Sequence, residues 1–140
     1  MTRIAVIDGQ GGGIGSAVVR KIKEACGQEV EVWALGTNVI ATTQMMKAHA
    51  NRGASGEAAI VWTVARADVI LGSVSIILAN AMMGEVTPAI AAAIASAPVL
   101  KILLPLAGSG LEIVGLTSEP LPHMVDKAIF GRLKEFLENV

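Results

Sequence analysis

Apolar residues along this chain fall into two patterns that alternate from one end to the other. Uninterrupted apolar runs are typical of strands in a parallel sheet covered on both faces, because every side chain of such a strand is buried. Apolar residues that recur every three or four positions are typical of a helix with one buried face. The clearest such stripe is Ile14, Val18, Ile22 and Cys26. The two patterns together predict alternating strands and helices.

Strands are predicted at residues 3–8, 30–35, 68–72, 99–104 and 112–116, the last of them short and at an edge. Helices are predicted at residues 14–26, 39–50, 56–66, 88–96 and 122–138. Thr87 followed by Pro88 marks the start of the fourth helix, because threonine caps helix N-termini and proline suits the first helical position. Residues 73–86 fit a helix and an extended chain equally well, so their conformation stays open.

This order of elements predicts a single α/β domain over residues 1–140. The sheet is expected to be Rossmann-like, doubly wound and mostly parallel, with about five strands in the order 3-2-1-4-5 between two layers of helices. Ligands of such sheets bind outside the carboxyl ends of the strands, where the strand order reverses. The loops at that edge are therefore the candidate site.

A loop with five glycines within residues 9–15 follows the first predicted strand. Glycine lets the backbone turn sharply and approach a ligand closely, and the unpaired N–H groups of the following helix point toward an anion. Gly9, Gly13 and Gly15 fit the spacing G-x-x-x-G-x-G, which resembles the cofactor loop of short-chain dehydrogenases. Ile14 breaks both the strict G-x-G-x-x-G spacing and the P-loop pattern. Phosphate binding is the leading interpretation, and a tight turn without a ligand is the alternative.

The chain lacks residues that short-chain dehydrogenases use. It has no tyrosine, so the Tyr-x-x-x-Lys pair that moves protons is missing. Dinucleotide-binding folds usually place an acid at the end of the second strand, where it binds ribose hydroxyls. Here that strand ends in Gly36, Thr37 and Asn38, which either hydrogen-bond a sugar or cap the next helix. An oxidoreductase using NAD or NADP would need proton-transfer groups from a partner or from its substrate.

Further stretches join the glycine loop at the predicted edge. The third predicted strand runs into Gly72 and Ser73, and residues 107–110 form a small glycine-containing loop. Arg52, in a turn between two predicted helices, offers a guanidinium to a phosphate or carboxylate; a plain surface arginine is the alternative. The candidate cofactor-binding residues are Asp8, Gly9, Gln10, Gly11, Gly12, Gly13, Ile14, Gly15, Gly36, Thr37, Asn38, Arg52, Gly72 and Ser73.

The acids expected nearest the cleft are Asp8, Glu57 and Glu85. Each fits a base, a ribose or metal contact, or a charge that caps a helix, and capping is the commonest of these roles. His49 and His123 fit no metal-ligand spacing, so no metal is expected. The catalytic residues stay unassigned.

Composition argues against some classes of partner and in favour of others. Net charge is −1 and the basic residues are scattered, which argues against nucleic acid. The lone Cys26, on an apolar stripe, indicates core packing in a reducing cytoplasm. The chain is 53% hydrophobic, but prolines and Lys101 interrupt its longest apolar stretches, so no membrane-spanning helix is expected. A sheet buried on both faces and a surface covered by a second copy explain the excess, which predicts a homo-oligomer, most simply a dimer.

Motifs spread over nearly the whole chain resemble those of a family of small prokaryotic proteins known as a domain of unknown function. They lie at residues 8–15, 34–38, 50–57 and 84–88. The resemblance implies a Rossmann-like fold with nucleotide binding and brings no established activity. Three functions fit the sequence: a module that binds a nucleotide, dinucleotide or other phosphorylated small molecule, which is the leading hypothesis; an NAD(P)-linked oxidoreductase; and a non-catalytic scaffold subunit.

Overall fold

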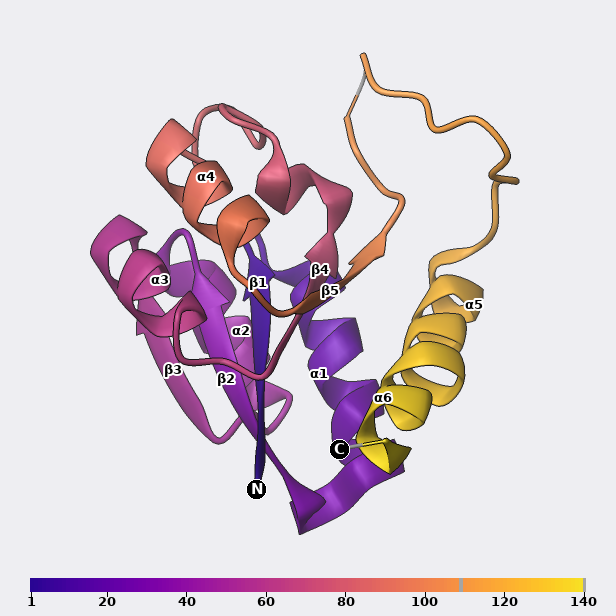
Figure 1. Ribbon diagram of the computed structural model, residues 1–140. Coiled ribbons are helices and arrows are strands. Elements are labelled where there is room, and N and C mark those ends of the chain that lie inside the picture. The colour runs from indigo at the N-terminus through magenta and orange to yellow at the C-terminus, as the bar shows by residue number, and fades with distance from the viewer. Residues whose placement is uncertain (109, 140) are drawn as a thin grey trace.

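The computed structural model describes residues 1–108 and 110–139. Five parallel strands form one sheet in the order β3-β2-β1-β4-β5, with helices on both faces (Figure 1). The strands are β1 (Thr2–Asp8), β2 (Val30–Gly36), β3 (Arg52–Ser55), β4 (Val69–Ser73) and β5 (Leu100–Leu104). The predicted three-layer, doubly wound, Rossmann-like fold is confirmed.

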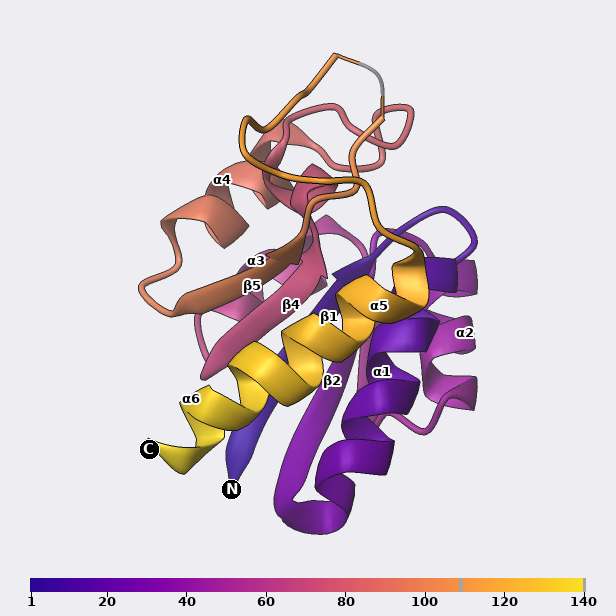
Figure 2. The ribbon, with the colours of Figure 1, turned by 90° about the vertical axis from the view of Figure 1, so that its right-hand side faces the viewer.

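Helices cover the two faces of the sheet unequally. They are α1 (Gly13–Cys26), α2 (Val39–Lys47), α3 (Glu57–Val64), α4 (Pro88–Ser96), α5 (Leu121–Asp126) and α6 (Lys134–Glu138). Short 3-10 turns form η1 (Gly27–Glu29) and η2 (Val74–Ile77), and a π-helical stretch, η3 (Lys127–Leu133), joins α5 to α6. Figure 2 shows α1 and the C-terminal helices side by side over one face. Helices α3 and α4 pack with η2 on the other face.

Strand β1 is the centre of the fold and delivers the glycine loop. Ile4, Ala5 and Val6 are 0% exposed, as an uninterrupted apolar run predicts for a strand covered on both faces. The strand pairs with β2 on one side and with β4 on the other. Its carboxyl end therefore places Asp8 and the loop that follows between β2 and β4.

Strand β3 corrects the predicted arrangement, because residues 52–55 were expected to form a turn. The strand has four small or exposed residues, so it carries neither hydrophobic pattern. Gly53 lies beneath α2, where a Cβ would come within 2.9 Å of the Met46 sulfur. The added strand makes residues 69–73 the fourth strand, next to β1, whereas the sequence placed them next to β2.

The prediction of a strand at residues 112–116 is wrong. Within the described residues this segment pairs with no strand, and Val114 is 99% exposed. Figure 1 places it in the long connection from β5 to α5. A short run of β-branched and apolar residues favours a strand only when a neighbouring edge receives it.

Residues 78–86, whose conformation the sequence left open, form a series of turns between η2 and α4. Asn80, Met82 and Met83 have left-handed φ angles of 70°, 56° and 56°. The N-cap predicted at Thr87 is confirmed, since its hydroxyl accepts the Ile90 N–H at 3.2 Å. No helix in the described part of the chain is long and apolar enough to cross a membrane.

Candidate functional site

A cleft of about 910 Å³ opens at the carboxyl edge of the sheet. It lies where the strand order reverses, because the chain runs from β1 to β2 and β3 on one side and then to β4 and β5 on the other. Its lining comes from residues 8–14, Ser73, Ser75, residues 78–83, residues 106–108 and residues 110–111. The cleft thus brings the predicted glycine loop together with the end of β4.

Two kinds of glycine occur in the loop. Gly12 has a left-handed φ of 75°, and a Cβ on Gly15 would lie 2.6 Å from the Met45 sulfur, so the turn and its packing require both. A Cβ on Gly11 or Gly13 would meet nothing within 4 Å, and neither residue has a left-handed φ. Both line the cleft. A tight turn therefore accounts for Gly12 and Gly15 but not for Gly11 and Gly13.

The backbone N–H groups of the loop also fall into two sets, those with a protein acceptor and those without one. Those of Gly9 and Gly15 donate to Asp8 at 2.8 and 2.6 Å. The N–H of Gly12 donates to the Gly9 carbonyl at 3.0 Å. The N–H groups of Gly11, Gly13 and Ile14 have no acceptor within the described residues. Unpaired N–H groups at the start of a helix attract anions.

Asp8 holds the backbone of the glycine loop through hydrogen bonds. The residue is 4% exposed, and its two carboxylate oxygens each accept one backbone N–H of the loop. Burial raises the pKa of Asp8 above its ordinary 3.8, against the opposing effect of the hydrogen bonds from Gly15 and Gly9. Asp8 is therefore a buried anchor that sets the loop geometry.

Glu85 holds the opposite side of the loop. One of its oxygens, Oε1, accepts the Gln10 N–H at 2.8 Å, the Thr37 hydroxyl at 2.7 Å and the Asn38 amide at 2.7 Å. Asn38 Oδ1 also caps α2 by accepting the Ala41 N–H at 2.9 Å. Of the two roles that the sequence left open for Thr37 and Asn38, the structure gives Asn38 the cap and gives both a protein carboxylate as partner.

The Glu85 bonds predict a pH-dependent contribution to stability. The hydrogen bond from Gln10 N–H, followed by that from Thr37, lowers the pKa of Glu85 below 4.5. A lowered pKa stabilises the fold above pH 4.5 and loses that contribution as the pH falls through the folded pKa. We therefore expect the difference in free energy of unfolding between wild type and Glu85→Gln to shrink from about pH 6 to about pH 3, as measured by urea unfolding.

Glu24→Gln is the matched control, because Glu24 is 58% exposed and pairs only at the surface with Lys21. Its effect is expected to stay within about 0.5 kcal/mol at each pH. A Glu85→Gln difference that grows in acid would contradict the prediction.

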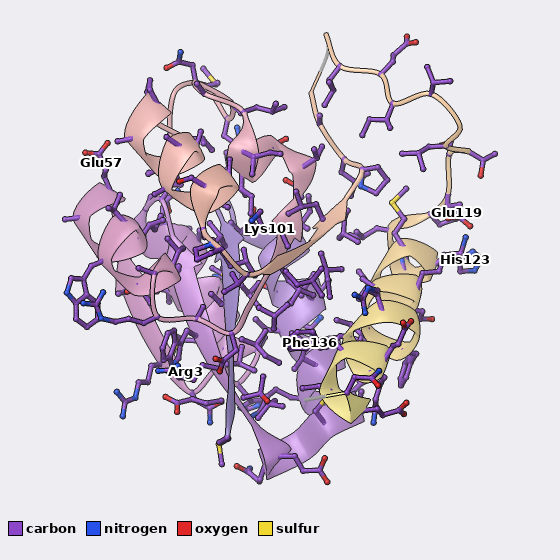
Figure 3. The ribbon with its side chains drawn as sticks, in the orientation of Figure 1. Arg3, Glu57, Lys101, Glu119, His123 and Phe136 are labelled. Atoms are coloured by element: carbon purple, nitrogen blue, oxygen red, sulfur yellow. The ribbon has the colours of Figure 1, made fainter. Side chains whose placement is uncertain are left out.

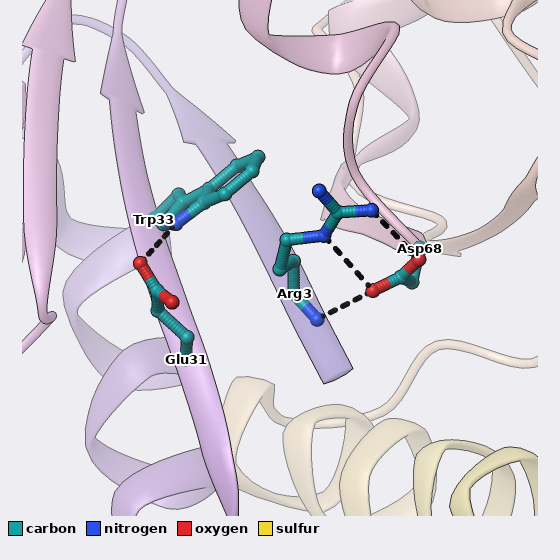
Figure 4. Close-up of polar contacts among 4 residues, drawn as sticks. All are labelled: Arg3, Glu31, Trp33 and Asp68. Atoms are coloured by element: carbon teal, nitrogen blue, oxygen red, sulfur yellow. Dashed lines mark hydrogen bonds and ion pairs between the residues drawn. The ribbon is translucent and has the colours of Figure 1, made fainter. Parts of the chain in front are cut away.

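Arg52 is not brought to the glycine loop. It starts β3 opposite Trp33, its Nε lies 3.1 Å from Glu31 Oε1, and its side chain is 78% exposed. Figure 4 shows that Glu31 also accepts the Trp33 indole N–H, close to the ion pair of Arg3 and Asp68. The guanidinium therefore belongs to a surface network near the amino ends of the strands.

Two predicted glycines serve packing rather than the cleft. A Cβ on Gly72 would lie 2.8 Å from the Ile7 carbonyl oxygen, and one on Gly36 would overlap the Thr42 hydroxyl. Neither residue lines the cleft. Their small size lets β4 and β2 approach the elements packed against them.

Ser73 and Ser75 stand at the floor of the cleft. Ser73 is 2% exposed, and its hydroxyl has no hydrogen-bond partner among the described residues. Ser75 donates to the Leu106 carbonyl at 3.2 Å. Ser75 and residues 78–83 were not predicted, because the sequence left the conformation after residue 72 open. The available signal was a serine at the end of a buried strand and a second serine two positions later. Ser109, in the predicted loop 107–110, lies outside the described residues.

The candidates Glu57 and His123 do not line the cleft. Glu57 begins α3 and accepts the Thr87 hydroxyl, while His123 lies in α5 on the far side of the molecule (Figure 3). Within residues 1–108 and 110–139, no group of three or more His, Cys, Asp or Glu side chains is placed to hold a metal ion.

Together the sheet order and the glycine-loop cleft define a Rossmann-like α/β protein with an anion-compatible loop at its switch point. The chain belongs to the family described as a domain of unknown function (DUF3842), which matches residues 3–137. Comparison with curated proteins gives no match. Among solved structures, the chain is similar to a dodecameric FMN-dependent UbiX-like decarboxylase from Escherichia coli O157:H7, with 14% identity, a TM-score of 0.47, and coverage of 97% of this chain and 94% of that one.

Proposed function

We propose that the cleft binds a nucleotide and holds its phosphate at the amino end of α1. The observation that carries this proposal is the pair Gly11 and Gly13, which the turn does not require and which leave open space at the cleft. The unpaired N–H groups of Gly11, Gly13 and Ile14 supply donors for phosphate oxygens, and the helix dipole favours the negative charge.

The rest of the cleft suits the other parts of a nucleotide. Its volume, about 910 Å³, lies in the range usual for small-molecule sites. Ser73 adds a hydroxyl that lines the cleft and has no protein partner in the described residues. Leu78, Met82, Leu106 and Leu111 provide apolar surface for an aromatic ring. The proposed role is binding, and no catalytic residue is assigned.

Gly13→Val tests the phosphate site. We expect the purified wild type to retain or bind a nucleotide among FMN, FAD, AMP, ATP, NAD and NADP, and a nucleotide at about 100 times its Kd to stabilise the fold by about 2.7 kcal/mol. The valine fills the space over the loop, so binding should weaken at least about tenfold while the free energy of unfolding changes by less than about 1 kcal/mol. Native mass spectrometry and calorimetric titration measure these effects.

Gly131→Val is the control, since a Cβ at Gly131, in the C-terminal helix, also meets nothing within 4 Å. It should leave nucleotide binding unchanged. Equal affinity of Gly13→Val and wild type would place the phosphate elsewhere, and a wild type that binds none of these nucleotides would overturn the proposal in favour of a scaffold.

We also propose that copies of the chain associate, most simply as a dimer. Large apolar side chains remain exposed on α2 and α3: Val39 is 68% exposed, Ile40 65% and Trp62 61%. Val39 and Ile40 are neighbours at the start of α2, and contiguous exposed apolar surface marks interaction sites. The same native mass spectra count the copies in the assembly.

A further inference from the structure

We propose that Glu85 determines ligand specificity by closing the dinucleotide half of the site, so that the cleft accepts mononucleotides and rejects dinucleotides. This inference rests on the proposed function and assigns a ligand class to the same site. It concerns the contact between the β1–α1 loop and the β2–α2 loop, whose residues Thr37, Asn38 and Glu85 do not line the cleft.

The position of Glu85 carries the inference. In dinucleotide-binding sheets the ribose of the adenosine half lies at the end of β2, where an acid that ends this strand binds its hydroxyls. Here no acid ends β2, and the carboxylate at this place comes from the turn before α4: its Oε1 bonds to Gln10 of the first loop and to Thr37 and Asn38 of the second. Glu85 therefore bridges the two loops at the place where that ribose would have to lie.

Charge adds a second barrier. The Glu85 carboxylate lies between the two loops, and the hydrogen bonds from Gln10 and Thr37 lower its pKa, which favours the ionised form. A 2′-phosphate brought to the same place would meet a like charge at short range. NADP should therefore be rejected more strongly than NAD.

Glu85 lies in a turn, residues 80–86, that is held by internal backbone hydrogen bonds. The Asn80 N–H donates to the Val86 carbonyl at 2.6 Å and the Val86 N–H to the Ala81 carbonyl at 3.1 Å, and Val86 is 0% exposed. The turn also packs directly on the glycine loop, because a Cβ on Gly9 would lie 2.7 Å from the Met82 sulfur and 3.0 Å from Glu85 Oε1. Gly9 thus admits this turn, which explains a third glycine of the loop.

Two matched ligand pairs test the inference: FMN with FAD, and nicotinamide mononucleotide with NAD. Each pair shares one nucleotide and differs by the second half. We expect the wild type to bind the mononucleotide of at least one pair at least tenfold more tightly than its dinucleotide, measured by flavin fluorescence quenching and calorimetric titration. Glu85→Ala should reduce this preference at least fivefold by strengthening the dinucleotide while leaving mononucleotide affinity within about twofold.

Glu85→Gln keeps a side chain of nearly the same shape, with an acceptor oxygen, but removes the charge. It should improve NADP binding more than NAD binding, which separates the electrostatic from the steric part of the effect. Glu57→Gln is the control, because Glu57 is a carboxylate whose hydrogen bond comes from Thr87 at the start of α4. It should change no ratio.

The outcomes are distinct. An unchanged preference in both Glu85 variants, or a wild type that binds dinucleotides as tightly as mononucleotides, overturns the specificity role and leaves nucleotide binding intact. Failure of the wild type and of both variants to bind any of the five nucleotides overturns the proposed function and this inference with it.

Discussion

Gly36→Ala is expected to lower the free energy of unfolding by about 3 kcal/mol, because the added methyl group has no space. A Cβ at this position would overlap the Thr42 hydroxyl and lie 2.5 Å from the Asn38 carbonyl oxygen and 2.7 Å from the Thr42 N–H nitrogen. Two of these three atoms are backbone and cannot rotate away. The same contact holds the start of α2 against the end of β2, so the methyl group would push the two elements apart.

Urea unfolding of Gly36→Ala and Gly131→Ala measures this effect against a control. Alanine at Gly131 meets no atom within 4 Å in a helical segment, where it is expected to be neutral or to stabilise the fold by up to about 1 kcal/mol. A Gly36→Ala protein as stable as wild type would mean that α2 shifts freely and that its contact with β2 does not constrain the fold.

Asp8→Ala is expected to cost about 3 kcal/mol, because it leaves the buried N–H groups of Gly9 and Gly15 without acceptors. The effect should depend on pH in the direction opposite to that of Glu85. Burial raises the pKa of Asp8 above 3.8, so its contribution is fully present below pH 3.8 and declines as the pH rises through the folded pKa. The stability difference between wild type and Asp8→Ala should therefore be largest in acid.

Asp126→Ala serves as the comparison, since Asp126 is 50% exposed and forms a surface ion pair with Lys21. Its cost is expected to stay below about 1 kcal/mol. An Asp8→Ala protein that matches it would show that water replaces the carboxylate under the loop.

The sequence predicts those parts of the fold that short-range patterns govern. The stripe of Ile14, Val18, Ile22 and Cys26 places α1 correctly, and three of these side chains are buried. Thr87 starts α4 because its cap involves a residue only three positions away. Strand β3 has no such local signal: its four residues become a strand through the neighbouring edge of β2 and the space that Gly53 leaves for α2.

The same distinction applies to the candidate site: the sequence shows the parts formed by neighbouring residues and not the parts formed by distant ones. The glycine loop is visible in the sequence because its residues are contiguous. Glu85 is named there only as a nearby acid, since its bond to Gln10 joins residues 75 positions apart and depends on turns with left-handed φ at non-glycine residues. Propensities disfavour such angles, so only the packed structure shows where that carboxylate lies.

The cleft also stands on the boundary between two successive portions of the polypeptide. Strands β1, β2 and β3 with their helices are complete before β4 is made, and β1 pairs with β2 at seven positions but with β4 at three. The edge of β1 that faces β4 is therefore paired only by strands that come later in the sequence. A ligand that touches both the loop after β1 and Ser73 would clamp this boundary, and the amides of β4 would then exchange their protons with solvent more slowly.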